Sequence, residues 1–258
     1  MPRLCLYIPC YNAARFLAAT VGRIPWTELP EGFDYLVLFV DNASQDATGE
    51  QVKAAQAALE AGGVSTHFIR HPQNRGYGGS VKSAMDYCVQ NGFAIMAVVH
   101  ADGQYAPELL PRMIGELQRR PESALHFGSR LTGAPLKGGM PLYKFIGNIV
   151  LSGVQNLFLA TRLSEFHSGY RLYHVPYLAR LPYQRCSDGF VFDNQIIFQI
   201  HCAGFGISES PIPTFYGEEK SHVPRIGTPL AILRELAVCV LHRWGLRRSR
   251  LYDVEVAP

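Results

Sequence analysis

Three polar segments carry the residues whose types and spacing could do chemistry, and the segment from His100 to Gln104 (HADGQ) is the most informative. It directly follows the apolar run Phe93–Val99. A carboxylate at the end of a buried strand, with oxygen or nitrogen ligands at alternate positions, can hold Mg²⁺ or Mn²⁺ against a diphosphate. The candidate metal ligands are therefore Asp102, Gln104 and His100. A strand-to-helix turn with a solvated Asp102 explains the same spacing.

A second acid, Asp41, follows the apolar run Tyr35–Val40 in the segment FVDNASQD. A carboxylate at that place is able to accept hydrogen bonds from a nucleobase or a ribose. The alternative is an Asx turn that caps a helix beginning near Ser44.

The third segment, Asn74 to Gly79 (NRGYGG), lies between a strand-like and a helix-like run. Glycines permit close backbone approach, and a helix N-terminus favours anions. The spacing does not match the dinucleotide-binding fingerprint, and an ordinary loop explains the segment nearly as well.

The elements that must position these residues alternate through the first half of the chain. We predict strands at Leu4–Ile8, Tyr35–Val40, Val64–Arg70, Phe93–Val99 and Ala124–Phe127. We predict helices after a cap at Asn12, from Ser44 onward, at Gly79–Gln90 and at Pro107–Arg119. This alternation indicates an α/β fold with a mainly parallel sheet and helices on both faces. Ligands of such sheets bind at the carboxyl ends of the strands, where all three polar segments fall.

The second half of the chain is less regular. Helices are predicted near Tyr143–Leu159 and Asp193–Ala203, and the Pro- and Gly-rich stretch Pro211–Pro229 is interpreted as a mobile loop over the site. The segment Leu230–Trp244 predicts a helix with one apolar face, made by Leu230, Leu233, Ala237, Val240, Leu241 and Trp244.

Arginines at 243, 247, 248 and 250 crowd the end of that last helix. The combination suits a helix lying on an anionic membrane surface, with Trp244 at the interface. Packing of the same face on the core or on a second subunit explains it equally well. We divide the chain into a domain at 1–228 and a C-terminal amphipathic basic helix and tail at 229–258.

Composition limits the class of protein. With 258 residues, 17% of them charged, the chain can bury one sizeable core, and a net charge of +3 is too small to indicate a nucleic-acid binder. Six scattered cysteines without a CxxC pair fit a reduced, cytoplasmic compartment. We expect neither a signal peptide nor a transmembrane helix, because the N-terminus lacks the charged region of a signal and no apolar run reaches about 18 residues.

Taken in order, the segments YIPCYNAARFL, VDNASQDAT, NRGYGGSVKSAM, HADGQYAPE, GSR, SEFHSGYRLY and FVFDNQII resemble family 2 glycosyltransferases. The likeness is greatest to the dolichol- and polyprenyl-phosphate sugar transferase branch, and it runs from about Leu4 to Tyr216. It implies a single GT-A domain with a Rossmann-like sheet, a nucleoside diphosphate sugar donor, a divalent metal, and inversion at the anomeric carbon.

The resemblance assigns roles to individual residues. Pro9, Tyr11 and Asn12 match the segment around the nucleotide base, and Asp41 matches the acid that reads base or ribose, while Asn42 stands where many members have a second acid. The remaining residues assigned to donor binding are Asn74, Gly76, Gly79, Lys82, Ala101, Arg130 and Ser168.

Around the chemistry, Asp102 and Gln104 match the second acid of the Asp-x-Asp element and its polar successor, and Arg171 matches a residue near the diphosphate. His100 replaces the first acid of that element, and Glu165 stands where the branch often has Asp. Imidazole ligates Mn²⁺ and also hydrogen-bonds ribose or phosphate. The catalytic candidates are Asp102, Arg171, Glu165, Asp193 and Asp188.

The acceptor decides whether a general base is needed. A lipid phosphate is ionised at neutral pH and needs only positive residues, for which Arg130, Lys137 and Lys144 are candidates. A saccharide hydroxyl would need one of the carboxylates Asp188, Asp193 or Glu165. We favour a polyprenyl or dolichyl phosphate acceptor, bound by a cytoplasmic protein in peripheral contact with the membrane.

Two rival classes stay open at this point. A nucleotidyltransferase would share the sheet and the metal acid, and a nucleotide-binding protein without turnover is suggested by His100. Whether the chain forms a homo-oligomer also stays open.

Overall fold

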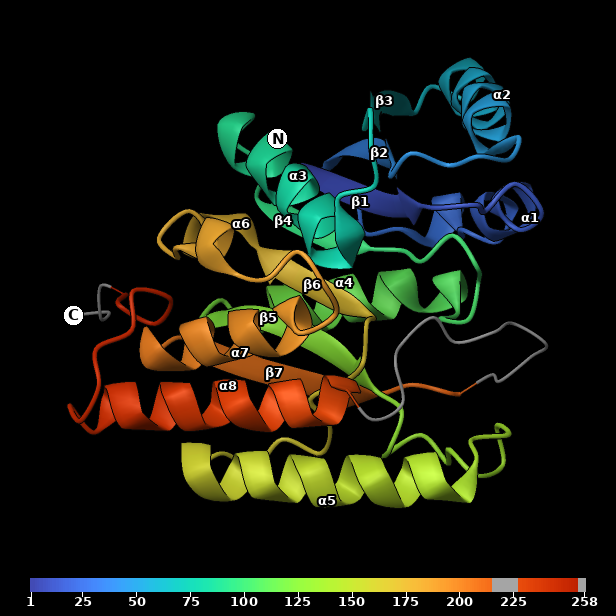
Figure 1. The fold of residues 1–258 in the computed structure, drawn as a ribbon. Coiled ribbons are helices and arrows are strands. Elements are labelled where there is room, and N and C mark those ends of the chain that lie inside the picture. The colour runs from blue at the N-terminus through green and yellow to red at the C-terminus, as the bar shows by residue number, and fades with distance from the viewer. Residues whose placement is uncertain (215–226, 255–258) are drawn as a thin grey trace.

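The computed structural model describes residues 1–214 and 227–254 of the chain. Its strands form a single sheet in the order β3-β2-β1-β4-β6-β5-β7 (Figure 1). The strands are β1 (Arg3–Cys10), β2 (Asp34–Asp41), β3 (Ser65–Arg70), β4 (Ile95–Val98), β5 (Ser123–Ser129), β6 (Arg171–His174) and β7 (Gly206–Pro211).

Helices cover both faces of this sheet (Figure 1). They are α1 (Leu17–Gly22), α2 (Thr48–Ala61), α3 (Gly76–Gln90), α4 (Leu110–Gln118), α5 (Leu142–Leu159), α6 (Val175–Leu178), α7 (Phe192–Cys202) and α8 (Gly227–Arg243). Short 3₁₀ helices lie at Trp26–Glu28, Pro107–Leu109 and Tyr183–Arg185. The predicted α/β fold with helices on both faces is confirmed.

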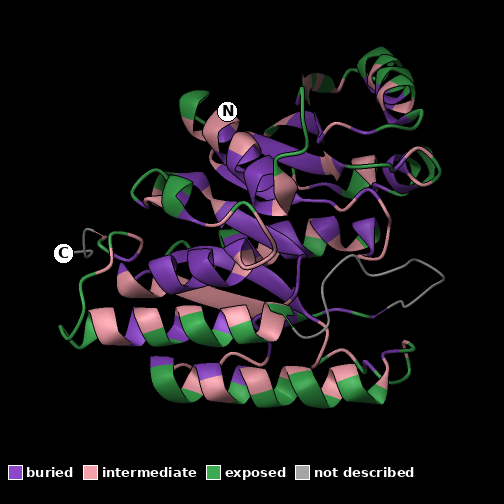
Figure 2. Cartoon of the chain, viewed as in Figure 1, coloured by how far each residue is buried: buried purple, intermediate pink, exposed green. Residues whose placement is uncertain are grey.

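Alternation along the strands explains why there are two cores. Cys5, Tyr7 and Leu38 belong to one apolar cluster, whereas their neighbours Leu6 and Phe39 belong to another. Because successive strand residues point to opposite faces, a strand that is apolar throughout needs cover on both sides. Figure 2 accordingly shows the central strands buried between the helices, whereas the edge strands β3 and β7 are only partly buried.

Two strands were not predicted from the sequence, β6 and β7. β6 runs antiparallel to both β4 and β5, and β7 pairs parallel with β5. The other pairings, β1 with β2 and β4 and β2 with β3, are parallel, so the sheet is mainly parallel as predicted. β6 has only four residues, two of them Arg171 and His174, and β7 has the polar sequence GISESP, so neither shows an apolar pattern.

Two predicted helix starts are wrong. Asn12 caps no helix, because α1 begins only at Leu17 and the Asn12 Oδ1 instead accepts a hydrogen bond from the Gln45 amide. α2 begins at Thr48 and not at Ser44, since Ala43 adopts a left-handed conformation (φ 64°) and the intervening residues form turns. The predicted loop at Pro211–Pro229 falls largely on residues 215–226, outside the described residues.

α8 packs against α5 and α7, and its inward residues are Ile232, Leu236, Cys239 and Val240. The predicted apolar face is therefore partly wrong: Val240 is buried, whereas Leu230, Leu233 and Trp244 are exposed. Further along, Tyr252 is fully buried in the larger core cluster. A division at residue 228 thus separates two chain segments that share one core. Within residues 1–214 and 227–254, we find no helix with the length and apolar character needed to span a membrane.

Candidate functional site

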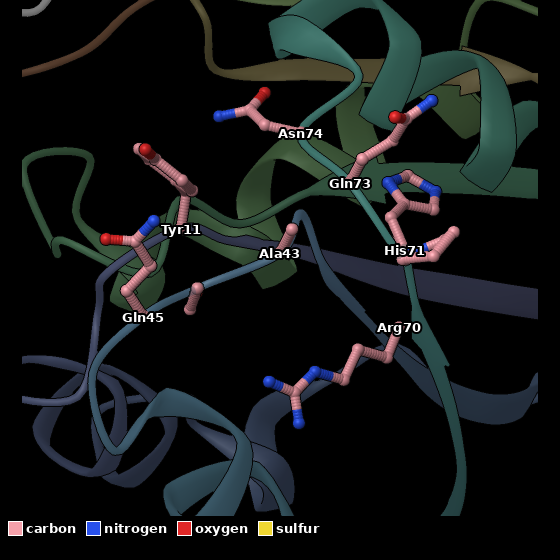
Figure 3. A pocket seen from close by; sticks show the side chains of 9 residues that line it. Tyr11, Ala43, Gln45, Arg70, His71, Gln73 and Asn74 are labelled. Carbon is pink, nitrogen blue, oxygen red and sulfur yellow. The ribbon is translucent and has the colours of Figure 1, made fainter.

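A hollow of about 530 Å³ opens where β2 and β3 end. Figure 3 shows Tyr11 and Gln45 on one side of it and His71, Gln73 and Asn74 on the other. Its full lining is Tyr11, Ala43, Ser44, Gln45, Arg70, His71, Pro72, Gln73 and Asn74. Sequence reasoning singled out Tyr11 and Asn74 but missed the run from Arg70 to Gln73. The signal was present, because that run directly follows the predicted strand Val64–Arg70.

Asp41 is fully buried beside the hollow, between the lining residues Ser44 and Arg70. Its Oδ1 accepts a hydrogen bond of 2.9 Å from the Ser44 amide, so the turn that the sequence offered as an alternative is present. Its Oδ2 lies 3.3 Å from the Arg70 Nε and accepts no hydrogen bond from the described residues. A buried carboxylate oxygen without a donor is the feature expected where a ligand supplies the donor.

Asn42 joins the end of β2 to the loop before α3. Its Oδ1 lies 2.8 Å from the His71 Nδ1 and accepts from the Arg75 amide at 2.9 Å. Its Nδ2 donates to the Asn74 Oδ1 at 3.0 Å and to the Gly76 carbonyl at 3.1 Å. An aspartate at 42 would lack the two N–H donors, so these contacts require an amide side chain.

The glycines of the NRGYGG segment approach a second part of the chain. A Cβ on Gly76 would lie 2.3 Å from the Asp188 carbonyl oxygen, and one on Gly78 would lie 2.3 Å from that of Ser187. The Gly79 amide donates to the Asp188 carbonyl at 3.2 Å. The close backbone approach that glycine permits is therefore present, and the backbone approached is that of residues 187–189.

Lys82, on α3, supports the same contact. Its Nζ is 2.6 Å from the Asp188 Oδ1 and donates to the Cys186 carbonyl at 2.8 Å. The Lys82 side chain is almost fully buried, whereas that of Asp188 is largely exposed. The ammonium group therefore holds the segment at 186–188 against α3.

Asp102 follows β4 and is partly exposed. Its Oδ1 accepts a hydrogen bond of 3.1 Å from the Gln104 amide. The His100 ring lies between Tyr77 and Tyr105, at centroid distances of 6.4 and 5.0 Å, and its Nε2 is 3.1 Å from the Gly169 carbonyl oxygen. Because a carbonyl only accepts, this nitrogen carries the proton. His100 is thus tied to the loop before β6.

The residues after β4 could bind a hard cation such as Mg²⁺ through a single carboxylate, that of Asp102. Among the described residues no group of three or more His, Cys, Asp or Glu side chains is arranged to hold a metal ion. Mg²⁺ is commonly bound through one or two carboxylates plus substrate phosphates and water. Asp102 fits that pattern, with the Gln104 amide fixing one carboxylate oxygen.

Each of the three carboxylates proposed as a general base is paired with a cation. Glu165 is fully buried, and its oxygens accept from the Arg130 Nε at 2.9 Å and from the Arg130 backbone amide at 2.7 Å. Asp188 is held by Lys82, as described above. Asp193, the first acid of α7, has its Oδ1 at 3.3 Å from the Arg171 Nη1.

Asp193 differs from the other two in its surroundings. Its Oδ1 also accepts a hydrogen bond of 3.3 Å from the Tyr77 hydroxyl. Burial raises the pKa of the Asp193 carboxyl, and the positive charge of Arg171 opposes that rise. Asp193 is thus a buried carboxylate that lies between the Tyr77 hydroxyl and the Arg171 guanidinium.

Arg171 is almost fully buried, and its guanidinium donates to backbone carbonyls. The acceptors are the carbonyl oxygens of Ser168 at 2.8 Å, Asp193 at 2.7 Å and Phe166 at 3.1 Å. Ser168 is fully buried as well. The guanidinium therefore ties the loop before β6 to the start of α7, and does not lie in the hollow.

Two further residues singled out from the sequence lie on the strand edge between these groups. Pro9 pairs with Val40 near the end of β1. Ala101 is buried beside Asp102, and its carbonyl accepts from the Thr20 Oγ1 at 2.8 Å. The structure thus brings Asp41, Asn42 and Asn74 together at one place, and His100 and Asp193 at a second, around Tyr77.

Comparison with known sequences agrees with this architecture. Residues 5–181 match the model of glycosyl transferase family 2. The undecaprenyl-phosphate mannosyltransferase of Micrococcus luteus is 28% identical, over 95% of this chain and 94% of its own. The polyprenol monophosphomannose synthase of Mycolicibacterium smegmatis is 26% identical, over 95% of this chain and 88% of its own.

Solved structures show the same fold. The glucosyl-3-phosphoglycerate synthase of Mycobacterium tuberculosis, in complex with Mn²⁺, UDP-glucose and glycerol 3-phosphate, superposes with a TM-score of 0.65 at 13% identity. The match covers all of this chain and 87% of that one. The sheet, the family match over residues 5–181 and these likenesses lead to one conclusion: the chain belongs to glycosyl transferase family 2 and is a glycosyltransferase with a GT-A-like fold.

Proposed function

We propose that the chain transfers a sugar, with inversion, from a nucleoside diphosphate sugar to a polyprenyl phosphate. The observation that carries the donor half of this proposal is the polar hollow at the ends of β2 and β3, with the buried Asp41 Oδ2 beside it. A ribose hydroxyl or a base N–H would supply the donor that this oxygen lacks.

The donor nucleotide occupies the hollow in this proposal. The exposed Tyr11 ring offers a face on which a base can stack, and Asp41 accepts from base or ribose. Pro9 and Asn12 shape the entry beside Tyr11. Asn42 and Asn74 contribute by holding the loop before α3 in place through their mutual hydrogen bond.

The diphosphate lies toward the end of β4. Asp102 would hold Mg²⁺ or Mn²⁺ there, with His100 and Gln104 beside it. When bound, the ion stabilises the negative charge that develops on the leaving diphosphate. The backbone N–H of Gln104 fixes the rotamer of the Asp102 carboxylate. Tyr77 and Tyr105, on either side of His100, hold the imidazole ring in place.

The buried polar residues act as positioning residues. Lys82 and the glycines Gly76 and Gly79 hold the segment at 186–188 against α3, and Arg171 holds the loop containing Ser168 against the start of α7. Ala101 fixes the turn after β4 through Thr20. These residues do not contact the substrate in this proposal; they act by holding the segments that do.

The acceptor half rests on two observations. Two relatives that align over 95% of the chain are named for undecaprenyl-phosphate and polyprenol substrates. In addition, Glu165 and Asp188 are each held in an ion pair, with Arg130 and Lys82, and so are engaged within the protein. A phosphate acceptor is already ionised and needs no base, whereas a hydroxyl acceptor does.

One observation favours a second candidate, transfer to a saccharide hydroxyl. Burial raises the pKa of the Asp193 carboxyl, as expected of a general base that works near neutral pH. In that case Asp193→Asn would abolish turnover of the hydroxyl acceptor, because it removes the base beside Tyr77 and Arg171.

The test is a matrix of donors and acceptors. The purified protein with Mn²⁺ or Mg²⁺ is offered UDP- and GDP-sugars, each with a short-chain polyprenyl phosphate or with simple saccharides, and the product is identified by mass spectrometry. We expect a glycosyl phospholipid with one nucleotide class. Formation of a disaccharide alone would overturn the acceptor assignment.

The matched variant for the donor site is Asp41→Asn. Its Oδ1 can still accept from the Ser44 amide, so the turn is kept, while the carboxylate charge beside Arg70 is lost. We expect the donor KM to rise by about tenfold or more, since a hydrogen bond involving a charged group is worth about 1.5–3 kcal/mol. An unchanged KM would remove Asp41 from donor recognition.

A further inference from the structure

On helix α5 most of the exposed residues are apolar, and two of the three buried residues are polar. Leu142, Ile146, Val150 and Leu157 recur at helical spacing, and each exposes half or more of its surface. Tyr143, Ile149 and Phe158 extend the same exposed side. In an ordinary surface helix the apolar stripe faces the core and the polar side faces water. Figure 2 shows α5 exposed or half-exposed along almost its whole length.

The side of α5 that faces the protein is polar. Gln155 is fully buried and its Nε2 donates to the Asn194 Oδ1, on α7, at 2.7 Å. Ser152 is buried too, and Asn156 donates to the Leu163 carbonyl at 2.7 Å. Leu159 and Val154 pack on the core at the C-terminal end of α5. Elsewhere the helix is attached through hydrogen bonds, and most of its apolar residues face outward.

The neighbouring helix α8 extends the apolar surface. α5 and α8 lie side by side (Figure 1), and Leu230, Leu233, Trp244 and Leu246 are exposed along and just beyond α8. Elsewhere in the described chain, the only large apolar residues that are exposed are Met1, Tyr11 and Leu136. The exposed apolar surface is thus concentrated on two adjacent elements.

Basic residues outnumber acidic ones around this surface, although Glu235 lies on α8 and Arg130 is paired with Glu165. Between residues 123 and 164 the sequence has no acidic residue and four basic ones, Arg130, Lys137, Lys144 and Arg162. Between 236 and 252 it again has no acid, but has Arg243, Arg247, Arg248 and Arg250. A second copy of the chain would bring these like charges together, whereas anionic headgroups complement them.

We propose that the outer side of α5, with the exposed side of α8, is the surface on which the protein lies on an anionic lipid bilayer, α5 being sunk into the boundary between headgroups and acyl chains. The inference deepens the proposed function and rests on it for its purpose, because a polyprenyl phosphate presents its head at the bilayer surface. β5 runs parallel to β4, so residues 130–141 lead from the sheet edge that carries the site directly to the start of α5.

The experiment is sedimentation of the full chain with vesicles of phosphatidylcholine and with vesicles that also contain phosphatidylglycerol. We expect binding to the anionic vesicles, weakened by salt. Val150→Glu and Leu157→Glu place a charge on the outer side of α5 without touching its polar contacts, and each should lower the vesicle affinity by about tenfold or more. Ala57→Glu, on the exposed side of α2, is the matched control and should bind normally.

Point variants are preferred to truncation, since removing α8 would also remove the core residues Leu236 and Cys239. Unaltered binding by both α5 variants would overturn the inference. A dimer in solution that Val150→Glu dissociates, with no vesicle binding by the parent chain, would assign the surface to a second copy and overturn it too.

Failure of the proposed function is distinguishable from failure of this inference. Turnover of a water-soluble, short-chain prenyl phosphate should be equal in the parent chain and the α5 variants, because α5 lies outside the donor hollow. If no prenyl phosphate is turned over while vesicle binding depends on Val150 and Leu157, the acceptor assignment falls and the membrane surface stands.

Discussion

The two ends of the sheet arrange polarity in opposite ways. Around β1, β2 and β3, apolar strands end in polar residues that face an open hollow, and the apolar core lies beneath them. Around α5, β5 and β6, charged and amide side chains such as Glu165, Arg171 and Gln155 are buried, while apolar ones face outward.

The difference shows which kind of partner each region is built to meet. A surface that presents unpaired polar groups suits a polar ligand, and one that presents apolar groups over a polar interior suits an apolar environment. It also predicts different costs of mutation: changes at the hollow edge should impair binding and turnover, whereas changes among the buried pairs should impair stability.

The largest effect is expected for Asp102→Ala. Turnover should fall by about a thousandfold, because the variant loses the one carboxylate that suits the cation, while stability should hardly change for a partly exposed residue. Steady-state rates and thermal unfolding measure the two effects. Asp34→Ala, an exposed acid at the opposite end of a strand, is the control and should keep full activity. Near-normal activity of Asp102→Ala would show that Asp102 does not bind a catalytic metal ion.

Arg130→Met tests the region of buried pairs. The substitution leaves the fully buried Glu165 without its cation, which should cost about 3–5 kcal/mol of unfolding free energy. Arg119→Met breaks an exposed pair with Glu116 and should cost less than about 1 kcal/mol. Urea unfolding compares them, and equal costs would contradict the distinction drawn here.

Two glycine substitutions sharpen the comparison further. Gly78→Ala places a methyl group 2.3 Å from the Ser187 carbonyl oxygen and should destabilise the fold by about 1–3 kcal/mol. Gly147→Ala, on the outer side of α5, meets nothing within 4 Å and should stabilise by up to about 1 kcal/mol through helix propensity. Opposite signs in thermal unfolding are the expected outcome.

A pH dependence is expected from His126, a fully buried residue of β5. Burial lowers the pKa of His126 to about 4, below the ordinary value near 6.5 that applies in the unfolded chain. Between these values the unfolded state binds the extra proton, so stability falls as pH falls. Going from pH 7.5 to 5 should cost about 2 kcal/mol at this residue. His126→Gln should remove that share; an unchanged pH profile would show that His126 titrates normally.

Most of the correct predictions came from the rule that ligands of parallel sheets bind at the carboxyl ends of the strands. It placed Asp41, Asn74 and Asp102 at one edge of a mainly parallel sheet, because apolar runs locate strands and their ends follow directly. The rival classes, a nucleotidyltransferase and a silent nucleotide binder, are set aside by family membership. Pocket residues such as His71 also follow a predicted strand, but their place beside Tyr11 in one hollow depends on the fold.

Other features depend on tertiary partners that a linear pattern does not reveal. β6 begins with Arg171, which is buried in a strand only because Asp193 and three carbonyls satisfy its guanidinium. A helix near Tyr143–Leu159 was predicted, but the inward side of α5 is set by Gln155 and its partner Asn194. For α8 the same limit applied, and the predicted face included the buried Val240.

The contact between the NRGYGG segment and residues 187–189 has a consequence for folding order. Gly76 and Asp188 are more than a hundred residues apart in the chain, yet their backbones touch, and Gly79 and Lys82 bond to the same segment. Closing so long a loop is entropically costly, and non-local contacts of this kind form late. We therefore expect the loop between β3 and α3 to remain disordered during synthesis until α7 has left the ribosome. The sheet of the nascent chain should then form before the hollow.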